Sequence, residues 1–216
     1  MGFFDFLFKK EACPLCSAPM GLFNSQVLRG SASICLQCAK GLRCKFPNEE
    51  REKLDEFGET EYNATGSVET YMYDHLSKAS LEEVKRVKSE LDGYKEKAQA
   101  ELGDAYPNIF TVFGETFHLS PSAVSVGMSR GGELQNKLVV NGLVQSGSFT
   151  KGDMAVLVHE GQKMPIRILE VHKKDDSSFE TTIGANMSKT AKAGDSAWLI
   201  LDWRGNVADG DTIAKQ

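Results

Sequence analysis

The sequence contains no long hydrophobic run. Its longest unbroken apolar stretches, residues 154–158 and 197–201, have five residues each, whereas a helix that spans a bilayer needs about 20. Residues 1–10 place their two lysines after the apolar side chains and lack a small-residue cleavage site, so they do not match a secretory signal. We therefore expect a cytoplasmic protein without a membrane-spanning helix.

The sequence also lacks the features of several large functional classes. It has 25 Lys and Arg against 30 Asp and Glu, a net charge of −5, which argues against a surface devoted entirely to nucleic acid. It has no Gly-x-x-x-x-Gly-Lys-[Ser/Thr] motif, so we expect no bound nucleotide. The four histidines are scattered, without the spacing of a metal or protease motif. We find no catalytic constellation and expect that the protein is not an enzyme.

Four of the five cysteines form two C-x-x-C pairs. Cys13 and Cys16 are separated by eighteen residues from Cys35 and Cys38, a spacing typical of a four-thiolate zinc site. Two such turns direct four sulfurs at one point, as tetrahedral Zn²⁺ requires. Disulfides or an iron site are the alternatives. We predict a structural Zn²⁺, because four sulfurs leave no position open for water or substrate.

The region around these cysteines is basic. Residues 1–48 carry six bases and two acids, a net of +4. Direct contact of this finger with nucleic acid is therefore one hypothesis, and simple compensation of the thiolate charge is the alternative. A short hairpin is expected over residues 21–34, with a turn at residues 29–31. The fifth cysteine, Cys44, is either a buried small apolar residue or a spare thiol.

The N-terminal residues MGFFDFLFKK, taken with the two cysteine pairs, resemble a small family of bacterial four-cysteine fingers found at the N-termini of poorly characterised proteins. The resemblance covers about a quarter of the chain and implies zinc but no activity. The apolar side chains of Phe3, Phe4, Leu7 and Phe8 could contact a membrane surface or a partner, or pack on their own domain.

The middle of the chain is acidic and favours helix. Residues 49–104 contain sixteen acids and eight bases, a net of −8, and no proline. Ser80 and Glu83 match a capping box. We predict a helix over residues 81–102 with an interruption at Gly93, preceded by helical pieces near 49–57 and 68–78. One side of this helix carries an apolar stripe, which could pack on the finger, on the C-terminal domain or on a second copy of the chain. The stripe consists of Leu81, Val84, Val87, Leu91, Tyr94 and Ala98.

The C-terminal half alternates β-rich segments with turns. Six or so strands without intervening helices predict a sandwich or a closed barrel, and closure removes exposed edges. The predicted strands are residues 109–119, 138–145, 154–159, 165–172, 181–187 and 197–203.

Several segments of this half resemble domain II of translational GTPases such as elongation factor Tu. They are residues 141–153, 165–173, 193–201 and 210–213, which carry Gly-Asp turns between strands. The resemblance spans roughly half of the chain and implies a β-barrel that docks on RNA or protein. The GTPase domain that precedes this barrel in the family has no counterpart here. Residues 106–216 have eleven bases and twelve acids, a net of −1, which does not favour phosphate contacts as the main source of affinity.

Together these patterns predict an α+β multi-domain protein. It consists of a zinc finger with an apolar N-terminal segment (residues 1–48), an acidic helical connector (49–105) and a closed antiparallel β-barrel (106–216). We expect a non-enzymatic adaptor that binds a protein or ribonucleoprotein partner. The alternatives are a peripheral protein at the inner face of the membrane and a nucleic-acid-binding finger protein.

Overall fold

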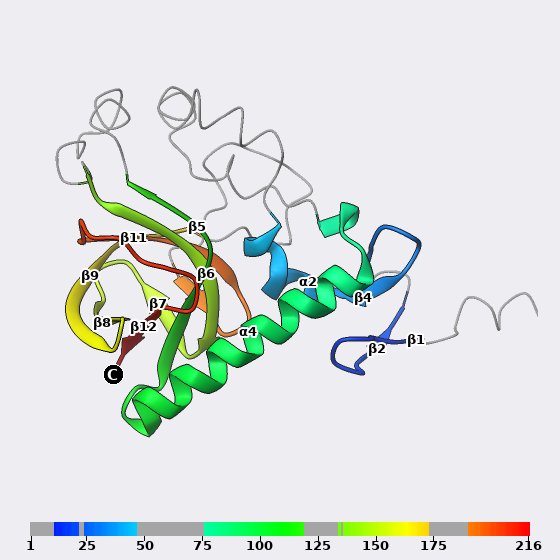
Figure 1. Ribbon diagram of the computed structural model, residues 1–216, viewed down its shortest axis with the longest axis horizontal. Coiled ribbons are helices and arrows are strands. Elements are labelled where there is room, and N and C mark those ends of the chain that lie inside the picture. Colours follow the sequence, from blue (N-terminus) through cyan, green and yellow to red (C-terminus); the bar gives the residue numbers. More distant parts are fainter. Residues whose placement is uncertain (1–10, 22–23, 47–75, 119–133, 135, 173–189) are drawn as a thin grey trace, which may run out of the picture.

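The computed structural model combines a small cysteine-bearing finger, a long helix and a closed β-barrel (Figure 1). The predicted α+β class and the closed antiparallel barrel are confirmed. The residues that the structure describes are 11–21, 24–46, 76–118, 134, 136–172 and 190–216.

Two small hairpins and a short helix form the finger, residues 11–46. The strands β1 and β2 form the first hairpin, and β3 and β4 the second. The second hairpin turns through Gly30 and Ser31, both with φ in the left-handed region, so the hairpin expected there is confirmed. The finger's elements are β1 (Glu11–Ala12), β2 (Pro19–Met20), β3 (Ser25–Val27), β4 (Ser33–Cys35), α2 (Leu36–Leu42) and the 3₁₀ helix η1 (Arg43–Lys45).

The long helix α4 (Leu81–Leu102) has the predicted bounds. The side chain of its N-cap, Ser80, accepts a hydrogen bond from the Glu83 amide at 3.2 Å, as a capping residue does. The interruption expected at Gly93 is wrong, because the helix continues through it. A single glycine costs a helix only about 1 kcal/mol, and buried Leu91 and Ala98 on either side hold the helix in place.

Short 3₁₀ helices flank α4 on both sides. They are η3 (Leu76–Lys78) and η4 (Gly103–Ala105). The helical pieces expected at 49–57, and at 68–78 up to residue 75, lie outside the described residues. Within the part of the chain that the structure describes, no helix has both the length and the apolar character needed to cross a membrane.

Six antiparallel strands close the barrel in the order β11-β6-β5-β12-β8-β9, and β9 pairs again with β11. The strand β12 was expected only as a closing turn. The predicted strand 181–187 lies outside the described residues. The barrel strands are β5 (Asn108–His118), β6 (Leu138–Ser146), β8 (Met154–His159), β9 (Gln162–His172), β11 (Ser196–Leu201) and β12 (Thr212–Lys215).

Large side chains fill the interior of the barrel. Phe110 packs edge-on against Phe149, with ring centroids 6.0 Å apart. Phe149 comes from β7 (Ser148–Thr150), which pairs with β10 (Thr190–Lys192) in a separate two-stranded sheet. The interior therefore forms a packed core, which includes Val112, Leu138, Val140, Val144, Leu157, Ile168, Leu199, Leu201 and Ile213.

The helix α4 bridges the finger and the barrel (Figure 1). Its first half contributes Val84, Val87 and Leu91 to the buried cluster of the finger, and barrel residues Phe113 and Leu143 belong to the same cluster. Its last residue, Leu102, packs with Val158 and Ala214 of the barrel. The apolar stripe thus packs on both the finger and the barrel.

Substitution of Gly93 by alanine should stabilise the protein, because Gly93 is an exposed position inside α4 and an added Cβ would meet no atom within 4 Å. We expect the free energy of unfolding to rise by about 0.5–1 kcal/mol, measured by urea denaturation. The reverse change at an exposed position of the same helix, Ala100→Gly, should lower it by a similar amount. A loss of stability in Gly93→Ala would contradict a continuous helix.

Candidate metal centre

The four paired cysteines lie at the ends of the finger's elements. Cys13 follows β1, and Cys16 lies in the tight turn between β1 and β2. The turn is closed by a hydrogen bond from the Ser17 amide to the Cys13 carbonyl at 2.8 Å. Cys35 ends β4 and is the N-cap of α2, and Cys38 lies in the first turn of that helix. The two hairpins and the helix therefore aim both pairs at one point.

The sulfur positions suit a single metal ion. All four Sγ atoms lie within 4.8 Å of one another. The Cys13–Cys38 distance is 4.0 Å and the Cys16–Cys35 distance is 3.6 Å. Four sulfurs placed at about 2.3 Å around a tetrahedral ion lie about 3.8 Å apart. These distances are much longer than a disulfide bond, and all four cysteines are free. The cluster could therefore bind one metal ion.

Backbone amides and burial act on the thiols in opposite directions. Burial opposes ionisation of Cys13, but hydrogen bonds from the amides of Cys35, Leu15 and Cys16 lower the pKa of its thiol to about 7. Burial, with the neighbouring sulfurs, raises the pKa of Cys38 well above its usual range, and burial also raises that of Cys35. A cation at the centre would supply the positive charge that lets all four sulfurs ionise together.

Cys44 does not belong to this cluster. It lies in η1 and is 3% exposed, and burial raises the pKa of its thiol to about 12. Its side chain is therefore a small buried apolar group, one of the two roles left open by the sequence. The residues expected to contact a membrane surface or a partner lie outside the described residues; they are Phe3, Phe4, Leu7 and Phe8.

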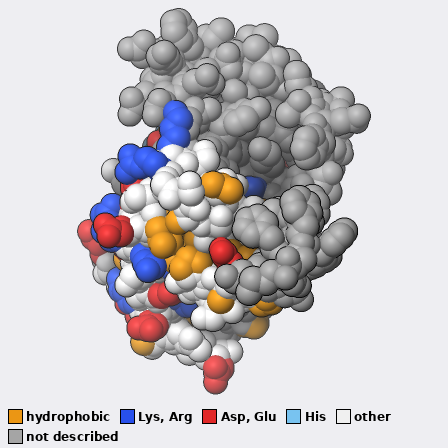
Figure 2. Space-filling model, turned by 90° about the vertical axis from the view of Figure 1, so that its right-hand side faces the viewer, with side chains coloured by type: hydrophobic (Ala, Val, Ile, Leu, Met, Phe, Trp, Pro, Cys, Tyr) orange, Lys and Arg blue, Asp and Glu red, His pale blue; other side chains and the backbone are white. Residues whose placement is uncertain are grey.

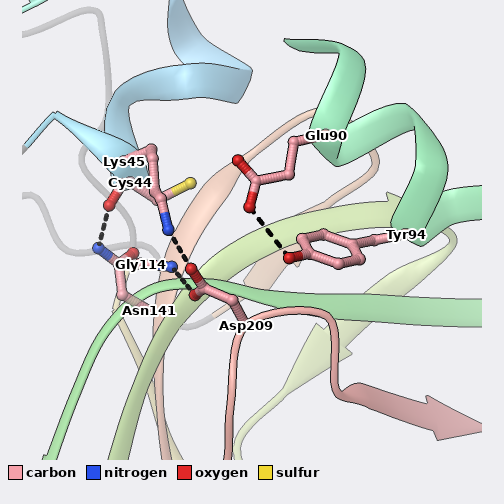
Figure 3. A network of polar contacts seen from close by, with 7 residues as sticks. All are labelled: Cys44, Lys45, Glu90, Tyr94, Gly114, Asn141 and Asp209. Carbon is pink, nitrogen blue, oxygen red and sulfur yellow. Dashed lines mark hydrogen bonds and ion pairs between the residues drawn. The ribbon is translucent and has the colours of Figure 1, made fainter. Parts of the chain in front are cut away.

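The backbone of Cys44 lies directly against the barrel (Figure 3). Its carbonyl accepts a hydrogen bond of 3.1 Å from the Asn141 side chain on β6. Opposite it, β5 shifts register between Val112 and Thr116. Within this irregularity a Cβ on Gly114 would lie 2.4 Å from the Cys44 carbonyl oxygen. Only a residue without a side chain fits there.

Lys45 extends this contact to a barrel loop and to α4. It forms an ion pair with Asp209, whose other oxygen accepts from the Gly114 amide at 2.9 Å (Figure 3). The Lys45 ammonium also lies 4.8 Å from the centre of the Phe113 ring. The Tyr94 ring meets the same Phe113 edge-on at 5.9 Å. One buried aromatic ring thus contacts both the finger and α4.

Tyr94 is held toward this junction by its own helix. Its hydroxyl donates to Glu90 at 3.0 Å (Figure 3). Burial, with the Glu90 carboxylate, raises the pKa of Tyr94 to about 12. The phenol therefore stays protonated and remains a hydrogen-bond donor at neutral pH.

A second set of contacts joins α2 to the turn before β11. Lys40 forms an ion pair with Asp195 at 2.8 Å, and the Ser196 hydroxyl donates to the Lys40 carbonyl at 2.6 Å. Asp195 also accepts from the Lys192 amide and so fixes its own turn. This Gly-Asp turn was recognised in the sequence only as part of the barrel. The structure adds the contact with the finger.

The described histidines are spread over three strands and stand apart from the cysteines. His118 contacts the Arg204 carbonyl at 3.1 Å, and His159 lies 2.7 Å from an Asp211 carboxylate oxygen. His172 is largely buried, which lowers its pKa. The fourth, His75, lies outside the described residues.

The finger end of the molecule exposes some apolar surface (Figure 2). Hydrophobic side chains lie in the middle of this face, and charged side chains of both signs lie along one flank. Val27 is 56% exposed and Leu36 is 41% exposed on the finger, while Met154 is 65% exposed on the barrel.

Comparisons with known proteins give little guidance. No protein-family model matches the chain, and no curated protein matches it. Among solved structures, GDP-bound aIF5B from Aeropyrum pernix is similar over 64% of this chain, with 13% identity and a TM-score of 0.36. The similarity covers 21% of that chain, about a fifth of its length. A likeness this low says nothing of what this chain binds or does.

Substitution of Gly114 by alanine tests the close contact with Cys44. Gly152→Ala is the control, because Gly152 also has a positive φ (91°) but an added Cβ would meet nothing within 4 Å. We expect Gly114→Ala to lower the free energy of unfolding by about 1–3 kcal/mol more than Gly152→Ala, through overlap with the finger backbone. Urea denaturation measures both. Equal losses would mean that the barrel does not contact the finger as described.

Proposed function

We propose that the chain is a non-enzymatic zinc-binding adaptor whose barrel docks on a protein or ribonucleoprotein partner. The observation that carries this proposal is the single buried cluster shared by the cysteine finger, α4 and the barrel. A metal site within this shared core supports a structural role, in which the metal keeps the finger and the barrel in a fixed arrangement for a partner. All four potential ligand groups are sulfurs, which would leave no position for a substrate on a tetrahedral ion.

The choice of zinc rests on the donor set. Four thiolates in tetrahedral array suit Zn²⁺, which has no geometric preference of its own, and an iron centre is the competing occupant. The sulfur separations of 3.6 Å and 4.0 Å lie on either side of the value for a Zn–S tetrahedron. Membership in the bacterial four-cysteine finger family, which the N-terminal sequence resembles, would be consistent with this metal.

The docking role of the barrel is proposed by resemblance to domain II of translational GTPases. Because side chains fill the interior of the barrel, a binding site on its outer surface is favoured and a ligand site inside it is not. The most exposed large apolar side chain on the described part of the barrel is Met154, which is polarisable and adaptable in binding surfaces. We place a partner contact there.

Metal analysis of the purified full-length protein tests the zinc site. We expect about one equivalent of zinc per chain in the wild type and in Cys44→Ala, because Cys44 lies outside the cluster. The Cys38→Ser variant should lose most of the metal, because a ligand is removed. Less than about half an equivalent in the wild type, or bound iron, would overturn the assignment of zinc.

Affinity capture from native cell extract, with and without ribonuclease, tests the adaptor role. Two matched variants replace one exposed apolar side chain each, Met154→Ser on the barrel and Val27→Ser on the finger. We expect a specific partner that Met154→Ser loses and Val27→Ser keeps. Loss of the partner after ribonuclease would identify a ribonucleoprotein. Loss in Val27→Ser alone would contradict docking through the barrel.

A further inference from the structure

We propose that metal binding at the four cysteines is coupled to docking of the segment Leu36–Lys45 on the barrel. The metal site then acts as a switch that covers or uncovers an apolar face of the barrel. This inference rests on metal binding as proposed above. It adds a regulatory consequence that the adaptor role alone does not require.

The same short segment carries metal ligands and barrel contacts. Its helix α2 begins at the N-cap Cys35 and contains Cys38, so two of the four sulfurs fix its first turn. Six residues after Cys38, the Cys44 carbonyl meets Asn141 of β6. Between them, the Lys40 carbonyl accepts from Ser196 of β11. No flexible linker separates the two functions, so a change in the first turn of α2 reaches the barrel directly.

The barrel face under this segment is apolar and depends on it for cover. Leu143 lies on β6 and is 7% exposed, and a Cβ on Gly41 of α2 would come within 3.5 Å of its side chain. Phe113 of β5 is fully buried and lies against Lys45 and Tyr94. Both side chains belong to the cluster of the finger. Release of residues 36–45 would expose Leu143 and the side of Phe113 that faces Lys45, while Tyr94 of α4 still covers the rest of that ring.

The contacts on the barrel also include polar groups that need their partners. The Asn141 side chain is 6% exposed and donates to the Cys44 carbonyl. Asp195, which is 4% exposed, faces the Lys40 ammonium. A buried polar group that loses its partner destabilises the structure. We therefore expect two distinct states, one in which residues 36–45 are docked and these hydrogen bonds are formed, and one in which the segment is released. Metal binding, which fixes α2, favours the docked one.

Coupling of this kind is reciprocal. If the metal stabilises docking, then docking must raise the affinity for the metal by the same factor. A substitution on the barrel that weakens docking should therefore weaken metal binding, although it leaves every sulfur in place. A metal site independent of the barrel would show no such effect.

The test measures the Zn²⁺ affinity of the full-length protein by competition with a chromophoric chelator. The test variant is Asn141→Ala, which leaves the Cys44 carbonyl without its side-chain donor. The matched control is Gln145→Ala, on the same strand, whose side chain bonds Thr111 within the barrel at 3.4 Å. We expect affinity to fall about tenfold in Asn141→Ala and to stay within about twofold of the wild type in Gln145→Ala.

Hydrogen exchange on the wild type gives a second measurement that needs no variant. Removal of zinc should raise exchange in residues 36–45 and also in the barrel strands β5 and β6. Equal affinities for Asn141→Ala and the wild type, or exchange changes confined to residues 11–35, would overturn the coupling. Failure of the wild type to bind zinc would overturn the proposed function itself, which separates the two failures.

If Asn141→Ala does not fold, Ser196→Ala replaces it, because Ser196 contacts the same segment through the Lys40 carbonyl. A fall in affinity of about three- to tenfold is expected there, since one hydrogen bond to the segment is lost. An unchanged affinity in this folded variant would count against the coupling as well.

Discussion

The packing of the described finger on the barrel depends on one close backbone approach, between Gly114 of the barrel and the carbonyl of Cys44. A side chain at position 114 would overlap that carbonyl, and Gly114 lies within the register shift of β5. The neighbouring contacts depend on this geometry, because Asn141 reaches the same carbonyl and Asp209 bonds the Gly114 amide. The finger therefore packs on the irregular part of β5, where Gly114 leaves room for the finger backbone.

The elements with a strong local signal could be predicted from the sequence. The helix α4 has a capping serine at its start and apolar residues at helical spacing, which determined its bounds. The cysteine pairs predicted a cluster, because ligand spacing in such turns is a local property. Most described barrel strands followed from β-rich runs between turns. The interruption predicted at Gly93 is wrong, because the free-energy cost of one glycine in a helix is smaller than the stabilisation from the buried residues on either side.

The contacts between the finger and the barrel could not be predicted in the same way. Asn141, Asp195 and Asp209 are distant in sequence from their partners, and each is a common residue type in a turn or strand. A signal was nevertheless present. In the sequence, residues 138–144 (LVVNGLV) and 196–201 (SAWLIL) are nearly continuous in apolar residues, whereas a barrel strand with one solvated face alternates. Such runs indicate strands covered on both faces, and here the finger covers Leu143 and Ser196 of their outer side.

The length of α4 has a further consequence. Its 22 residues at a rise of about 1.5 Å each make a rod of about 33 Å. One end is anchored in the core beside the cysteines through Val84 and Val87, and the other end is anchored on the barrel through Leu102. The helix therefore fixes the distance between the core beside the cysteines and its contact with Val158 and Ala214 on the barrel. Any two molecules held at its opposite ends would be kept at a constant separation, set by the number of helical turns.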